Sequence, residues 1–117
     1  MELILTFLEE YEGAEEQFEK GRYKNATILF SKAFFALCDI LIFQKIKKLP
    51  KNHGERFRIL EEFYPPVYLA ADKIFSHYID AYNKPLLKEN SEFIQNGIKQ
   101  IIRLSELPAE IKEVINR

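Results

Sequence analysis

Apolar residues recur along the chain with the spacing of amphipathic helices, and the segments between glycines and prolines are longer than typical strands. The pattern predicts an all-α fold, an antiparallel helical bundle of five to six helices. The sequence allows two starts for the fifth helix, one turn apart, because Ser91 is an alternative N-cap. The expected helices cover residues 2–20, 23–47, 55–63, 66–83, 88–104 and 109–116.

The second expected helix is apolar on nearly every side between residues 26 and 43, which is typical of a core helix that other helices surround. Lys32 and Asp39 are among its few polar residues. They argue against a membrane-spanning segment, because each would lie in hydrocarbon. An unpaired carboxylate in such a stretch is costly, so we expect Asp39 to reach solvent or to pair with Lys32, Lys73 or His77.

The composition fits one globular domain over residues 1–117, with 47% apolar and 30% charged residues. The net charge of −1 means that nucleic acid would have to be recognised by a local patch, and no membrane partner is expected. One cysteine, Cys38, excludes an internal disulfide, and without a signal-peptide pattern we expect a cytoplasmic protein. The spacing of the two histidines matches no metal motif, so neither a metal nor a cofactor is expected.

The segment Ala14-Glu-Glu-Gln-Phe-Glu-Lys-Gly-Arg-Tyr-Lys-Asn-Ala26 has the pattern of two helices joined at a glycine. A helix rich in alanine and phenylalanine follows, and then Lys51-Asn-His-Gly-Glu-Arg-Phe57. With these motifs the chain resembles the HEPN domain over about residues 10–84. The resemblance implies a small prokaryotic helical bundle, often encoded beside a minimal nucleotidyltransferase. A tetratricopeptide unit shares the hairpin pattern, but no second unit follows.

The resemblance also implies a ribonuclease signature, in which four to six residues separate an arginine from a later histidine. His77 best matches that histidine, but none of residues 70–72 is basic, and no arginine precedes His53 at this spacing either. A nuclease would then use His77 as the general base and Lys73, one turn earlier, as the cation. The alternative function is therefore a metal-independent, toxin-type ribonuclease with a degenerate site.

Residues 45–58, which we name the basic segment, contain six basic residues and one histidine against the single acid Glu55. This segment could hold the phosphate groups of a nucleotide or RNA, while tyrosines of the fourth helix stack on bases. Its structural interpretation is a solvated loop whose lysines complement a helix C-terminus. The candidate nucleotide- or phosphate-binding residues are Lys45, Lys47, Lys48, Lys51, His53, Arg56, Arg58, Tyr78 and Tyr82.

Five apolar residues crowd the first two turns of the first helix, Leu3, Ile4, Leu5, Phe7 and Leu8. One face can pack on the second helix, and a second copy of the chain would cover the other. A homodimer is also what the HEPN resemblance implies. The sequence thus favours a non-catalytic HEPN-like module that binds a nucleotidyltransferase-type partner, a nucleotide or RNA. The ribonuclease and a plain scaffold for protein partners are the alternatives.

Overall fold

The structure, a computed structural model, describes residues 2–116. It confirms the all-α prediction, because the described residues form helices and no strand. A short 3-10 helix, η1 (Glu113–Asn116), ends the described chain. The α-helices are α1 (Glu2–Glu19), α2 (Tyr23–Ile46), α3 (His53–Phe63), α4 (Pro65–Asn83), α5 (Lys88–Leu104) and α6 (Ala109–Lys112).

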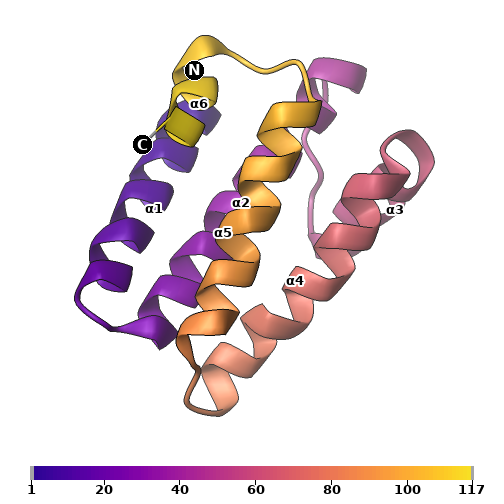
Figure 1. The fold of residues 1–117 in the computed structure, drawn as a ribbon. Coiled ribbons are helices and arrows are strands. Elements are labelled where there is room, and N and C mark those ends of the chain that lie inside the picture. Colours follow the sequence, from indigo (N-terminus) through magenta and orange to yellow (C-terminus); the bar gives the residue numbers. More distant parts are fainter. Residues whose placement is uncertain (1, 117) are drawn as a thin grey trace.

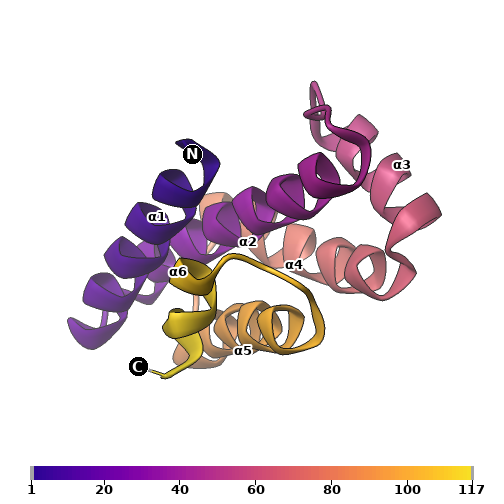
Figure 2. The same cartoon turned by 90° about the horizontal axis from the view of Figure 1, so that it is seen from above.

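The helix α2 lies at the centre of the bundle, where it packs against α1, α3, α4 and α5. Figure 1 shows α1 and α2 side by side as an antiparallel pair, with α3 at the outer edge of the molecule. Seen from above in Figure 2, α4 and α5 lie beneath α2, and α6 closes the space between α1 and α5. Leu37 and Phe34, near the middle of α2, are fully buried.

By length and apolar composition alone, α2 could cross a membrane. However, 72% of its most apolar window is buried inside the bundle. Burial of this extent accords with the core helix that the sequence predicts, while the cytoplasmic location stays a prediction.

The turn between α1 and α2 is built as the sequence predicts. Gly21 has φ +73°, the left-handed conformation that glycine adopts without steric cost. Its N–H donates to the Phe18 carbonyl, and the Arg22 N–H donates to the Gln17 carbonyl, so these two carbonyls in the last turn of α1 are satisfied. Ala14 and Ala26 are fully buried beside the turn, where small side chains let the two backbones approach.

One predicted helix start, that of α3, differs from the structure by two residues, whereas the predicted start of α5 at Lys88 is confirmed. α3 begins at His53 rather than at residue 55, because the Asn52 side chain accepts a hydrogen bond from the Glu55 N–H at 2.9 Å and caps the helix. Ser91 is not the N-cap of α5, which starts at Lys88. Its hydroxyl is fully buried against Thr27 of α2, at 2.9 Å between the two oxygens.

The apolar start of α1 is mostly covered within the chain. Phe7 is fully buried, and Leu3, Ile4 and Leu8 pack against the core, so Leu5, at 65% exposure, is the strongly exposed member of the five. α6 packs on α1, with Ile111 fully buried. The surface that suggested a homodimer is therefore smaller than the sequence predicts, and the homodimer stays a prediction.

Candidate functional site

A three-residue polar cluster joins α2 to α3. The Arg56 Nε donates to Asp39 Oδ1 at 2.7 Å, and its Nη2 donates to Asp39 Oδ2 at 2.9 Å, so the two side chains form a bidentate salt bridge. The third guanidinium nitrogen, Nη1, lies 2.6 Å from His53 Nδ1. Both charged side chains are largely buried, with 13% exposure for Arg56 and 16% for Asp39. The cluster therefore fixes the first turn of α3 against the core helix.

The predicted partners of Asp39 were wrong. Lys32 lies on the same helix seven residues away, a rise of about 10 Å, and is exposed to solvent. His77 contacts α5 instead. Arg56 reaches Asp39 because α3 starts at His53 and its first turn lies against α2.

The ring of His53 lies in an aromatic cluster with Phe35, Phe57, Phe75 and Tyr78, at centroid distances from 4.9 to 6.4 Å. Burial, followed by the Arg56 charge, lowers the pKa of His53, so the ring is neutral at pH 7. A guanidinium can only donate, so Nδ1 accepts from Arg56 and the ring proton must lie on Nε2.

His77, on the α5 side of α4, is also held by a hydrogen bond to its Nδ1 atom. The Asn90 side-chain oxygen accepts from the Leu87 N–H at 2.9 Å, which points its amide nitrogen at His77 Nδ1, 3.0 Å away. His77 also packs on the Phe93 ring at 4.8 Å. Nδ1 of His77 is thus an acceptor. Among the described residues no arginine hydrogen-bonds to it, and the structure gives it no polar contact with Lys73.

The lysines of the basic segment lie around the C-terminal end of α2. Lys45, Lys47, Lys48 and Lys51 are exposed, and none has an ion pair among the residues that the structure describes. Lys47 is left-handed at φ +59° and donates to the Gln44 carbonyl at 3.1 Å.

The remaining candidates differ in accessibility. Arg58 is exposed and lies 3.9 Å from Glu55, a weak surface pair. Tyr78 is packed against Phe35, and its pKa is raised to about 12 by the hydrogen bond with Tyr82 and by burial. Tyr82 is 55% exposed, so its ring is the accessible aromatic surface of the pair.

Beside the polar cluster, a hollow of about 240 Å³ lies between α1, α2, α3 and α4. Glu10 of α1 and Lys32 of α2 line it together with Arg56 and Asp39. Burial raises the pKa of Glu10, and Lys32 opposes that rise. Two acids and two bases balance in the hollow, so it offers no net charge to a phosphate.

Sequence reasoning missed three contributors to this region. Asp39 was recognised as costly but not as the partner of Arg56, because that contact depends on how α3 packs against α2. Asn90 and Glu10 carried no signal, because their roles depend on how α5 and α1 pack against neighbouring helices.

Comparison with protein-family models, curated protein sequences and solved structures finds no match to this chain. Within residues 2–116, no group of three or more His, Cys, Asp or Glu side chains is placed to hold a metal ion. The functional argument is therefore made from the geometry of the chain itself.

We expect the free energy of unfolding to fall as the pH drops below about 6.5. The pKa of His53 is lower in the folded state than in the unfolded state. The histidine therefore contributes to the free energy of unfolding above the unfolded-state pKa of 6.5, and this contribution is lost as the pH falls through the folded-state pKa. Chemical denaturation from pH 8 to pH 5 measures this dependence. Glu10, whose pKa is raised, contributes with the opposite sign.

A His53→Asn variant isolates the effect of histidine titration. The asparagine amide oxygen replaces Nδ1 as the acceptor for Arg56, but it does not titrate. We expect the variant to show a smaller loss of stability over this pH range than the wild type. Equal losses in the two proteins would show that His53 does not carry the effect.

Proposed function

We propose that the chain is a non-catalytic binding module that holds the phosphate groups of a nucleotide or RNA on the basic segment. The observation that carries the proposal is the group of exposed lysines at the end of α2, which have no ion-pair partner among the described residues. Free ammonium groups of this kind are available to neutralise phosphates. Tyr82 is exposed one turn after Tyr78, whose ring packs near His53 of the basic segment, and would supply an aromatic ring for a base.

The distribution of charge along the molecule supports this proposal. α2 has 24 residues and is therefore about 36 Å long. The basic segment follows its C-terminal end, whereas Glu12, Glu15, Glu16 and Glu19 lie in the half of α1 nearest the opposite end (Figure 1). An anion is therefore attracted to one end of a nearly neutral protein.

The histidine hydrogen bonds favour binding over cleavage. A ribonuclease of the expected type needs a ring nitrogen that can accept a proton. In both His53 and His77, Nδ1 already accepts a hydrogen bond, so this nitrogen is engaged within the protein. Arg56, the cation nearest to a histidine, is committed to Asp39. The HEPN resemblance, a nucleotidyltransferase partner and a homodimer remain predictions beside this proposal.

The experiment compares RNA binding by two double variants. We expect Lys48→Ala/Lys51→Ala to weaken binding of a short, labelled single-stranded RNA, measured by fluorescence anisotropy at about 50 mM and about 200 mM salt. Removing two phosphate contacts should reduce the slope of log K against log salt by about 1.4. Both side chains are exposed, so the fold should be unaffected.

The matched control is Lys20→Ala/Lys24→Ala, which removes the same charge from exposed positions at the other end of α2. The proposal expects near wild-type affinity and salt dependence for this variant. An equal loss in both variants would indicate a diffuse charge effect, and absence of binding at the lower salt concentration would refute the proposal.

A further inference from the structure

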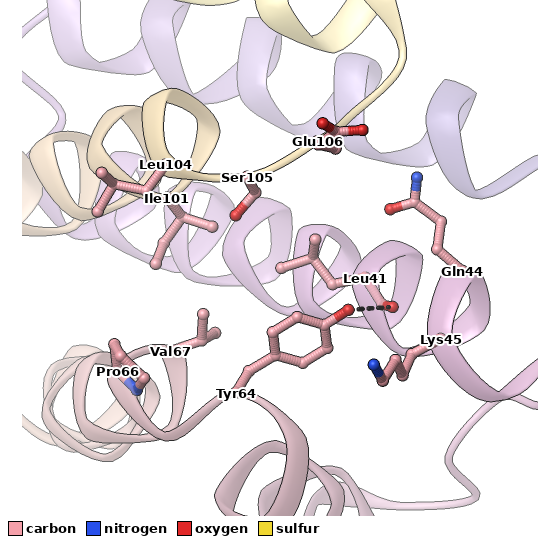
Figure 3. A pocket seen from close by; sticks show the side chains of 10 residues that line it. All are labelled: Leu41, Gln44, Lys45, Tyr64, Pro66, Val67, Ile101, Leu104, Ser105 and Glu106. Carbon is pink, nitrogen blue, oxygen red and sulfur yellow. Dashed lines mark hydrogen bonds between the residues drawn. The ribbon is translucent and has the colours of Figure 1, made fainter.

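A cleft of about 550 Å³ lies between the C-terminal half of α2, the start of α4 and the end of α5, away from the polar cluster. Figure 3 shows its apolar lining, with Leu41 and Val67 facing Ile101 and Leu104 across the opening. Leu41, Val67 and Ile101 are at most 7% exposed, whereas Leu104 is 75% exposed. The cleft is within the size range of small-molecule sites and is bordered by a leucine that no side chain of the bundle covers well.

The polar groups of the cleft are few and unevenly placed. Lys45 and the Tyr64 hydroxyl lie on one side in Figure 3, while Glu106 lies on the opposite side. The Tyr64 hydroxyl donates to the Leu41 carbonyl at 3.4 Å, a long bond that leaves its oxygen free to accept. The Lys45 ammonium lies 6.0 Å from the Phe63 ring centre and has no carboxylate partner among the described residues.

We propose that this cleft binds a single-chain amphipathic carboxylate, such as a medium-chain fatty acid, with its tail on the apolar lining and its head group at Lys45. The tail would cover Leu104 and remove apolar surface from water. The carboxylate head group would accept a charge-assisted hydrogen bond from the Lys45 ammonium, which has no carboxylate partner among the described residues.

The charge on the Lys45 side of the cleft favours an anionic head over a cationic one. Lys45 and Glu106 are the charged residues that line the cleft, and Figure 3 places Lys45 on the side of the Tyr64 hydroxyl and Glu106 on the opposite side. An alkyl ammonium of the same length would meet repulsion on the Lys45 side. The inference shares Lys45 with the basic segment, but the apolar lining lies outside that segment, and decanoate binding is tested without RNA.

Isothermal titration with decanoate, decanol and decylamine tests the proposal on the full chain, below the concentrations at which these compounds form micelles. We expect decanoate to bind, decanol to bind more weakly and decylamine to bind least. Lys45→Met, which keeps the length of the stem and removes the charge, should weaken decanoate by about tenfold and leave decanol unchanged. Lys48→Met, outside the cleft, should bind decanoate as the wild type does.

Ser105→Phe provides an independent test, because Ser105 lines the cleft in extended backbone at the end of α5 and a phenyl ring there fills the space. This variant should lose both decanoate and decanol while its circular dichroism stays helical. The proposal is overturned if decanoate fails to bind the wild type at about 1 mM. It is equally overturned if Lys45→Met leaves decanoate affinity unchanged, if Ser105→Phe binds decanoate normally or if decylamine binds more tightly.

Discussion

Replacing Asp39 by alanine should lower the free energy of unfolding by about 3 kcal/mol. The variant leaves the Arg56 guanidinium largely buried, without the carboxylate that accepts two of its hydrogen bonds. The two side chains keep some exposure to solvent, so the expected loss lies at the lower end of the range for breaking a buried ion pair. Urea denaturation followed by circular dichroism measures the change.

Two comparisons make this prediction specific to the pair. The double variant Asp39→Leu/Arg56→Met removes both charges, so it should be more stable than Asp39→Ala. Asp80→Ala breaks an exposed pair with Lys84, 3.5 Å long, and should cost about 0.5 kcal/mol or less. If Asp39→Ala cost no more than Asp80→Ala, the polar cluster would not fix α3 to the core.

A Phe30→Ala variant should lose about 4 kcal/mol of stability, the largest effect that we expect from one substitution. Phe30 is fully buried on α2, and its ring lies 5.4 Å from that of Tyr11 and 6.4 Å from that of Phe18 on α1. The deletion leaves a cavity where the two helices meet. The expected loss is a large fraction of the 5–15 kcal/mol that is typical for the stability of a whole domain.

The same substitution at an exposed aromatic residue is the control. Phe63, at the end of α3, is 38% exposed, so Phe63→Ala should cost about 1 kcal/mol or less by thermal or urea denaturation. Similar losses for Phe30→Ala and Phe63→Ala would contradict the placement of α2 at the centre of the bundle.

Much of the fold was predictable from the sequence because its signals are local. Helical spacing of apolar residues gave the order of the helices, and Gly21 marked the turn after α1. The start of α3 was missed by two residues, although Asn52 is a favoured capping residue. The alternative N-cap Ser91 lies inside α5 instead, and its hydroxyl bonds to α2, a contact that depends on packing between distant segments.

The site was less predictable, because its contacts depend on how whole helices rotate against one another. The sequence predicts His53 and Arg56 as groups that contact phosphate and Tyr78 as a stacking ring, whereas the structure packs all three into one cluster. His77 faces α5 and Asn90, which no local pattern indicates. The apolar cleft combines residues of three helices and is likewise invisible in the sequence.

The central claim is that both histidines serve the structure as hydrogen-bond acceptors, and our proposal that the chain binds phosphate groups without cleaving RNA rests on it. Long-range proton–nitrogen NMR of the imidazole rings at neutral pH tests this most directly. The account predicts that Nδ1 of His53 and of His77 carries no proton and accepts a hydrogen bond, with the ring proton on Nε2. A proton on Nδ1 of either ring, with Nε2 free to act as a base, would contradict it.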